Sequence, residues 1–182
     1  MGLQGVLAAL LLEGAAHGYQ LKGTLEDELG PLWVTSASQV YLTLGRMQRD
    51  DLVSSRRVRQ QALPDRQLLS LTRAGRALAE RWLYESDDPD ESVLRLAVAR
   101  IVAPRHFSDV VDIIVEQRSA GLAELRQLRA QDATGFQREA IDAEIQRAQA
   151  DVRWAASIRD RAAAIVAIPR APRQAGRVAH HG

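Results

Sequence analysis

The chain has 182 residues, enough for one large domain or two small ones with a hydrophobic core. It contains no cysteine, which excludes disulfide bonds, a thiolate nucleophile and cysteine-ligated zinc or iron–sulfur sites. A hydrophobic content of 46%, a charged content of 26% and an aromatic content of 4% are typical of a folded, helix-rich protein rather than a disordered chain.

Nothing in the sequence predicts a membrane protein. No apolar run reaches the roughly 20 residues that a helix needs to cross a bilayer. Residues 3–12 are apolar, but no cationic segment precedes them and Glu13 follows at once, which favours a core helix over a signal peptide. Because the chain also lacks cysteine, we expect a cytoplasmic protein.

Charge is distributed unevenly along the chain. The formal net charge is +1, but residues 36–81 contain nine arginines and four acidic residues, which gives this segment a net charge of +5. Residues 82–168 contain 11 arginines and 15 acidic residues, a net charge of −4. The basic block suits a partner with a phosphate backbone, although a solvated basic face is the commoner explanation of an arginine cluster.

Three helices are predicted in the first 50 residues. The first covers residues 2–13 and ends at Gly14, a residue suited to the left-handed C-cap position. The second covers residues 18–29 and ends at Gly30. Ser36 and Gln39 have the spacing of a capping box, so a third helix begins near residue 36.

The third helix is predicted to have one buried and one polar face. Val40, Leu44 and Met47 recur at spacings of four and three and form the buried stripe. The side chains that point elsewhere are short, polar or basic, namely Ser38, Gln39, Thr43 and Arg46.

A hairpin and a closing helix follow. Residues 52–58 alternate in the manner of a strand with a basic surface, and a second strand around Leu69 follows a turn at Pro64-Asp65. Thr72 then caps a helix over residues 73–84. Three helices, a two-stranded wing and a closing helix are the elements of a winged helix-turn-helix, whose third helix enters the major groove of DNA.

Seven successive motifs in residues 3–84 resemble those of the PadR family of transcriptional regulators, in order and in spacing. They are Leu10-Leu11-Leu12-Glu13-Gly14, His17-Gly18-Tyr19-Gln20-Leu21, Leu32-Trp33, Ser38-Gln39-Val40-Tyr41 with Leu44 and Met47, Asp51-Leu52-Val53, Pro64-Asp65-Arg66, and Leu71-Thr72-Arg73-Ala74-Gly75.

The resemblance implies a homodimeric, repressor-type regulator that binds a pseudo-palindromic operator and often leaves it when a small effector binds. The sequence departs from the family pattern where Asp51 replaces a usual glycine, Leu63 a common arginine and Leu69 a usual tyrosine. Aspartate tolerates left-handed backbone geometry, so the first change is harmless. The other two make minor-groove contacts by the wing less certain, with Arg56 and Arg66 as the remaining candidates.

The DNA contacts are assigned to the third helix and the wing. Glutamine pairs with adenine and arginine with guanine, so Gln39 and Arg46 are candidates for base contacts. Ser36 is a helix cap with a potential phosphate contact. The family counterpart of Tyr41 faces DNA. The hydroxyl groups of Tyr41 and Tyr19 either donate hydrogen bonds to phosphates, or the two rings pack within the protein. The candidates on the helices and the tyrosines are Ser36, Ser38, Gln39, Tyr41, Thr43, Arg46 and Tyr19. Four arginines of the wing either neutralise phosphates or are simply solvated, namely Arg56, Arg57, Arg59 and Arg66.

An effector pocket is a weaker hypothesis. Flat aromatic walls suit planar aromatic or cationic ligands, and Trp33, Trp82 and Trp154 either line such a pocket between domains or pack in the core. His180 and His181 are interpreted as part of a tail rather than as a metal site, and no metal or cofactor is predicted. Because the sequence has no cysteine nucleophile, no Gly-rich phosphate loop, no metal signature and no His–carboxylate pair at informative spacing, we expect no enzyme activity.

The carboxyl-terminal half is predicted to consist of long helices. An acidic boundary at residues 86–91 leads into a helix that runs to about Ala103, and a second helix runs from Phe107 to about Ala130. A turn at residues 132–135 separates it from a third helix, about 30 residues and roughly 45 Å long, that ends before Pro169. Its apolar stripe packs either against the second helix of the same chain or against a second copy.

Dimerisation is the preferred interpretation, because the small residues of this stripe allow two helices to approach closely. The predicted interface comprises Val111, Ile114, Leu125, Leu128, Ile141, Ile145, Ala148, Val152, Ala155 and Ala162.

The sequence therefore predicts a mainly α protein. Residues 1–84 form a winged helix-turn-helix, residues 85–168 an antiparallel long-helix dimerisation domain, and residues 169–182 a flexible basic tail. The predicted function is a homodimeric regulator that binds an inverted-repeat DNA operator and is released by a small effector. The alternative is a winged-helix protein-interaction module that binds no operator.

Overall fold

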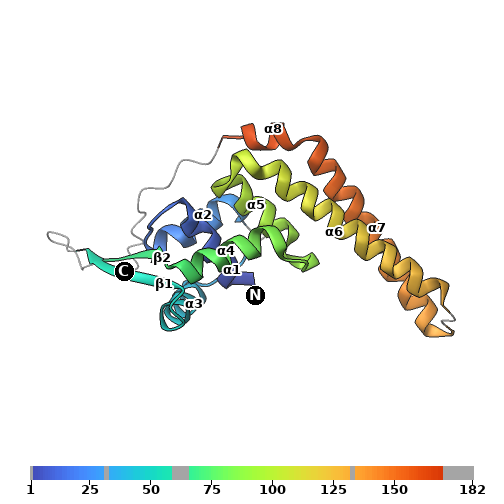
Figure 1. Cartoon of the computed structure of the whole chain (residues 1–182), viewed down its shortest axis with the longest axis horizontal. Helices are drawn as coiled ribbons and strands as arrows, with labels where there is room; N and C mark the ends of the chain where they lie inside the picture. The colour runs from blue at the N-terminus through green and yellow to red at the C-terminus, as the bar shows by residue number, and fades with distance from the viewer. Residues whose placement is uncertain (1, 31–32, 59–65, 132–133, 170–182) are drawn as a thin grey trace, which may run out of the picture. The chain divides into compact units, whose positions relative to one another are not determined.

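The computed structural model describes residues 2–30, 33–58, 66–131 and 134–169 (Figure 1). These residues fall into two compact units, an amino-terminal unit over Met1–Glu85 and a carboxyl-terminal unit over Ser86–Ile168. No helix in the described ranges is both long enough and apolar enough to cross a membrane. The architecture is mainly helical with one two-stranded sheet, as the sequence predicts.

The amino-terminal unit has the element order of a winged helix-turn-helix. Helix α1 packs against α4 and α3, and α2 packs against α3. A two-stranded antiparallel hairpin extends from these helices (Figure 1). The elements are α1 (Gly2–Leu10), η1 (Leu11–Glu13), α2 (Gly18–Leu29), α3 (Ala37–Arg49), β1 (Val53–Val58), β2 (Arg66–Leu71) and α4 (Arg73–Glu85).

The core of this unit is formed by the apolar faces of the four helices. Trp82 of α4 lies so close to α1 that a Cβ atom on Gly5 would be 2.3 Å from its ring. Glycine is therefore required at that position, because any larger residue would displace the indole. The buried stripe predicted for α3 is confirmed, since Val40 and Met47 have no exposed surface and Leu44 is 4% exposed.

The first helix differs from the prediction at its end. Only Gly2–Leu10 is α-helical, and Leu11–Glu13 forms a tighter 3-10 turn. Gly14 has φ 138° and ψ −173°, an extended conformation with positive φ that is almost confined to glycine, rather than the left-handed C-cap conformation expected. The chain thus leaves the helix in an extended direction, which brings Ala16 alongside β2.

The capping box predicted for α3 is confirmed. The backbone N–H of Gln39 donates to Ser36 Oγ at 3.2 Å, and the backbone N–H of Ser36 donates to Gln39 Oε1 at 3.2 Å. These two bonds satisfy donors that the first turn of a helix leaves open, which fixes the start of α3 at Ala37.

The hairpin is tied to the start of the helix-turn-helix. Val53 pairs with Leu71 and Arg57 with Gln67 along β1 and β2. Ala16 forms a further bridge to Leu69, with N···O distances of 3.0 and 2.9 Å in the two directions. The predicted turn at residues 64–65 lies outside the described residues.

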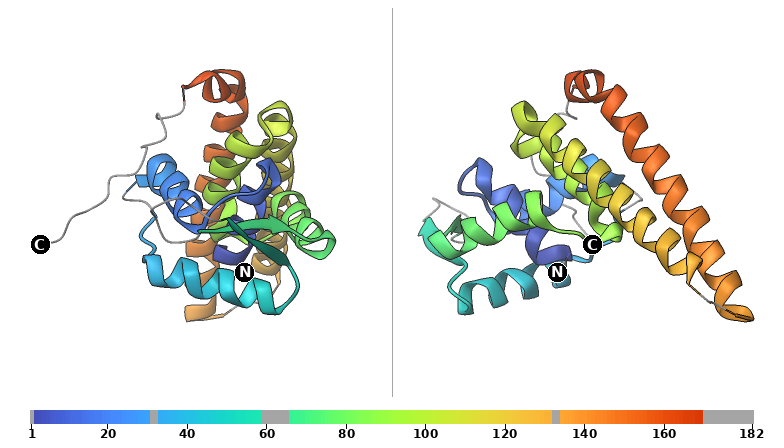
Figure 2. Two further views of the ribbon diagram at one scale, coloured as in Figure 1. Left: turned by 90° about the vertical axis from the view of Figure 1, so that its left-hand side faces the viewer. Right: turned by 45° about the vertical axis from the view of Figure 1, so that its right-hand side comes forward.

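The carboxyl-terminal unit is built around a helical hairpin. Helices α6 and α7 run side by side in opposite directions (Figures 1 and 2). The acidic boundary segment and α5 precede them, and α8 packs against α6. The elements are η3 (Pro89–Glu91), α5 (Ser92–Val102), η4 (Pro104–His106), α6 (Phe107–Ala130), α7 (Phe136–Asp160) and α8 (Ala162–Ala167).

The predicted 30-residue rod is wrong. Helix α7 ends at Asp160, Arg161 leaves helical geometry with φ −110° and ψ 8°, and α8 is a separate six-residue helix. The physical reason is the packing of α8 on α6, which buries Ala162. The hairpin within one chain, left open as an alternative by the sequence, is the arrangement observed.

Candidate nucleic-acid interface

The outer face of α3 is polar and basic. Ser38, Gln39 and Arg46 are exposed, and Thr43 is half-buried at the edge of the same face. Because the opposite face is the buried stripe, packing of the stripe fixes which side chains α3 presents to solvent. The structure therefore brings together the four polar residues that the sequence assigned to groove contacts.

Gln39 already has a structural role. Its Oε1 atom accepts from the backbone N–H of Ser36 at 3.2 Å and lies 3.4 Å from Ser36 Oγ. Bidentate pairing with adenine uses both the oxygen and the nitrogen of a glutamine amide. In this structure the oxygen is engaged in the cap, so base pairing by Gln39 requires the cap to open.

The two tyrosines of the predicted site come from different helices, Tyr19 from the first turn of α2 and Tyr41 from α3. Tyr41 is 53% exposed, and a Cβ atom on Gly18 would lie 2.8 Å from its ring, so the ring packs on the first residue of α2. Tyr19 is 45% exposed and stacks on His17 with ring centroids 5.7 Å apart. Both side chains combine a packed ring with an accessible surface.

The hairpin contributes a second basic surface. Arg56 and Arg57 are exposed on β1, as neighbouring residues that point to opposite faces of the hairpin. The backbone of Arg66 pairs with Val58 at the far end of the described ladder. Arg59 lies outside the described residues.

Two exposed residues of α3 were missed in the sequence. Leu42 is 63% exposed and Arg49 is exposed in the last turn. Together with Arg46 they follow the spacing of four and three on the side opposite the buried stripe. The sequence contains that spacing. Because only polar and basic residues were selected as DNA contacts, Leu42, which is apolar, was passed over.

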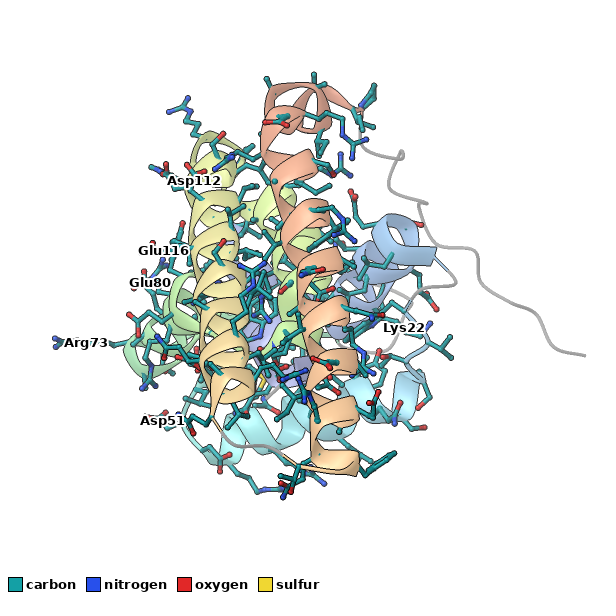
Figure 3. All side chains as sticks on the ribbon, turned by 90° about the vertical axis from the view of Figure 1, so that its right-hand side faces the viewer. Lys22, Asp51, Arg73, Glu80, Asp112 and Glu116 are labelled. Atoms are coloured by element: carbon teal, nitrogen blue, oxygen red, sulfur yellow. The ribbon has the colours of Figure 1, made fainter. Side chains whose placement is uncertain are left out.

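Charged side chains also lie outside α3 and the hairpin, in both units. Figure 3 shows Asp51 and Arg73 on one side of the amino-terminal unit and Lys22 on the other. In the carboxyl-terminal unit Asp112 and Glu116 project from the same side of α6, one turn apart. This acidic face of α6 is unsuited to a phosphate backbone.

The three tryptophans of the predicted effector pocket differ in burial. Trp82 is 3% exposed and packs against Gly5, so it belongs to the core and not to an effector pocket. Trp33 is half-buried in the amino-terminal unit, and Trp154 is half-buried on α7 in the other unit. An effector site at the latter two residues stays a prediction.

Four residues of the predicted dimer interface are covered within one chain. Val111 and Ile114 have no exposed surface, Ala155 is 1% exposed and Ala162 is 6% exposed. They form the core between α6 and its neighbours, so they are not available to a second copy, and their inclusion in the interface is corrected. The six others retain exposed surface, namely Leu125, Leu128, Ile141, Ile145, Ala148 and Val152.

A comparison of the sequence with known families connects this geometry to a function. Residues 6–81 match the transcriptional regulator PadR-like family, over a range that runs from α1 to α4 and includes α3 and the hairpin. The chain thus carries a PadR-like family domain. Members of this family are transcriptional regulators and not enzymes, in agreement with the sequence prediction.

The chain is also similar to two curated regulators and to a solved structure. A probable transcriptional regulator of Mycobacterium tuberculosis is 28% identical over 131 residues, which cover 72% of this chain and 66% of the relative, slightly under two thirds. The negative transcriptional regulator PadR of Bacillus subtilis is 23% identical over 129 residues, covering 68% of this chain and 71% of the relative. The chain in the crystal structure of B. subtilis PadR in complex with operator DNA has 21% sequence identity to this chain and a TM-score of 0.43. The match covers 87% of this chain and 96% of that chain.

Proposed function

We propose that this PadR-like protein is a transcriptional repressor that binds an inverted-repeat DNA operator as a homodimer and is released by a small effector. The observation that carries the proposal is the basic surface made by two elements of one domain. Arg46 and Arg49 are exposed on α3, and Arg56 and Arg57 are exposed on the hairpin. No acidic residue lies between positions 37 and 49, within α3 itself.

The dimensions of α3 suit the major groove. Its 13 residues correspond to about 20 Å of helix, and one helix fits the width of the groove. Arginines on the hairpin then face the flanking phosphates, which position the domain without reading sequence. Repression is supported by the relative in B. subtilis, which is a negative regulator.

A homodimer is supported by apolar surface left on the helical hairpin. Leu128 is 47% exposed on α6, and Ile141, Ile145 and Val152 of α7 are only half-buried. A second copy packed on this surface would remove it from water and pair two recognition helices, with half-sites about 34 Å apart.

The test begins with selection of bound fragments from a genomic DNA library, followed by affinity measurements on the selected duplex and a scrambled duplex. We expect a preference for one inverted repeat and an affinity that falls steeply with salt. The double variant Arg46→Ala and Arg49→Ala loses the operator, whereas the exposed Arg153→Ala on α7 retains it. Absence of any duplex preference at low salt, or full binding by the double variant, overturns the proposal.

Two further measurements test the assembly and its release. Sedimentation at micromolar concentration is expected to give a dimer, and a single chain would overturn the paired arrangement. Small aromatic and cationic compounds are then added to the protein–operator complex. Displacement by one of them supports release by an effector, which the family resemblance implies, and retention against the whole set argues against that part of the proposal.

A further inference from the structure

Six glycines of the described helices fall into two groups. Some are required by close neighbours and others face open space. The first group comprises Gly5, Gly18 and Gly75, where a Cβ atom would lie 2.3 Å from Trp82, 2.8 Å from Tyr41 and 1.9 Å from the Leu52 oxygen, respectively. The second group comprises Gly23, Gly45 and Gly121, where no heavy atom of the described chain lies within 4 Å of that position, apart from the helix's own nearby backbone.

Gly45 differs from the other two open glycines in its location. It lies in the interior of α3, on the side opposite the buried stripe. Ser38, Leu42, Gly45 and Arg49 follow one another at intervals of four, three and four residues, so they form one row along the exposed face. Gly45 is a gap in this row between an exposed leucine and an exposed arginine.

A glycine in a helix interior is unfavourable for folding, because it gains conformational freedom in the unfolded chain. Contacts within the described chain give no steric reason for that cost at Gly45. The absent side chain does, however, allow another molecule to approach the helix backbone closely. On the face assigned to the major groove, that molecule is DNA.

We propose that Gly45 is the point of closest approach between α3 and the operator, and that the missing side chain lets Leu42 and Arg49 reach the bases on either side. This inference rests on the proposed function, since it specifies how the same helix reads its site. A methyl group at residue 45 would hold the helix away from the groove floor and weaken base contacts along the whole row.

The test uses Gly45→Ala with Gly23→Ala as its matched control. Gly23 lies in the interior of α2 and also faces open space, so both changes remove the same helix penalty. We expect both variants to melt about 2–4 °C above the parent protein. Operator affinity is expected to fall about tenfold or more for Gly45→Ala and to stay unchanged for Gly23→Ala.

A second variant and a second duplex distinguish failure of the inference about Gly45 from failure of the proposed function. Gly45→Leu is expected to weaken operator binding further than Gly45→Ala, while affinity for scrambled duplex changes little for either. If the parent protein prefers its operator and Gly45→Ala binds it equally well, the inference fails and the proposed function stands. If the parent protein shows no duplex preference, the proposed function itself fails. Equal losses for the Gly23 and Gly45 variants would also overturn the inference.

Discussion

The imidazole Nδ1 of His17 lies 2.8 Å from the main-chain oxygen of Gln67, which joins the N-cap of α2 to the second strand of the hairpin. The two residues are 50 positions apart in the sequence. With the neighbouring bridge between Ala16 and Leu69, this contact holds the base of the wing against the helix-turn-helix.

Replacement of His17 by alanine is expected to loosen the wing. The loss of one hydrogen bond is worth about 1 kcal/mol, and the amide of Leu69 should exchange faster with solvent as the adjacent bridge weakens. Hydrogen exchange and thermal unfolding measure the two effects. His106→Ala serves as the control, since His106 is exposed and bonds to Asp109 one turn away. Unchanged exchange at Leu69 in His17→Ala would contradict this role.

Asp51 is expected to tolerate glycine but not a β-branched residue. Its φ is 55°, in the left-handed region, and it is the one described non-glycine residue with positive φ. Asp51→Val should lower the free energy of unfolding by about 1–2 kcal/mol, whereas Asp51→Gly should cause no loss. Asp50, with φ −85°, provides the control, and Asp50→Val is expected to stay within about 0.5 kcal/mol. Chemical denaturation distinguishes these values.

Leu42 is expected to contact a thymine methyl group, because it is a large apolar side chain that is 63% exposed on the face of α3 that we propose enters the groove. Operator duplexes in which deoxyuridine replaces thymine lack this methyl group. The parent protein should lose several-fold in affinity when the relevant thymine is replaced, and Leu42→Ala should be insensitive to the same replacement. Equal sensitivity of both proteins at every thymine would exclude the contact.

Much of the fold could be predicted because its determinants are local. The start of α3 follows from the Ser36–Gln39 capping box, and the bounds of α6 agree with the prediction of a helix over residues 107–130. The break at Arg161 could not be predicted, because neither glycine nor proline marks it and the apolar period continues through Ala162. Tertiary packing of α8 on α6 decides it.

The candidate site shows the same division. Periodicity placed Ser38 and Arg46 on the outer face of α3 correctly, since it needs only the buried stripe as a reference. The same periodicity cannot tell which partner covers an apolar stripe. Val111 and Ile114 have the spacing of an interface, but their partners belong to the same chain.

Arg95 is expected to be essential for the carboxyl-terminal unit. It has no exposed surface, and its guanidinium donates to the main-chain oxygen of Ser86 and to Gln117 Oε1, the latter at 2.9 Å. Arg95→Ala removes the donor to these two acceptors and the positive charge near the buried Glu91, which should cost about 3 kcal/mol of stability. The exposed Arg105→Ala should change stability by less than about 0.5 kcal/mol. Denaturant unfolding compares the two variants.

The pH dependence of Arg95 has a definite sign. Burial, followed by the nearby charge of Arg118, lowers the pKa of Arg95 to about 10. The folded state therefore disfavours the charged form relative to the unfolded state, and this penalty is constant below about pH 10. It declines only at higher pH, so Arg95 contributes no pH dependence to unfolding near neutrality.

The link between Arg129 and Asp142 is expected to make the helical hairpin sensitive to acid. Arg129 Nε donates to Asp142 Oδ1 at 2.5 Å and a second nitrogen donates to Oδ2 at 3.1 Å, joining α6 to α7. This bond lowers the pKa of Asp142 below its usual range. Its stabilising effect is present above the unfolded pKa of about 4 and is lost as the pH falls through the folded pKa.

The prediction is tested by melting the parent protein and Asp142→Asn between pH 7 and pH 2. The parent should melt higher at neutral pH, and the difference should shrink as the solution is acidified. Glu144→Gln is the control, because Glu144 pairs with Arg147 within α7 and does not join two helices. A difference for Asp142→Asn that is independent of pH would exclude the ionic origin.

The hydroxyl of Thr72 donates to the main-chain oxygen of Asp51 at 2.6 Å and accepts from the backbone N–H of Gly75 at 3.1 Å. Asp51 follows α3 closely, and Gly75 lies in the first turn of α4, whose far end continues into the carboxyl-terminal unit. The Thr72 hydroxyl thus links the end of α3 to the first turn of α4, alongside the bond from the Thr72 backbone N–H to the Leu52 oxygen at 3.1 Å. The junction between α3 and α4 is therefore held by side-chain and main-chain bonds that converge on Thr72, so loss of its hydroxyl would remove two of them at once.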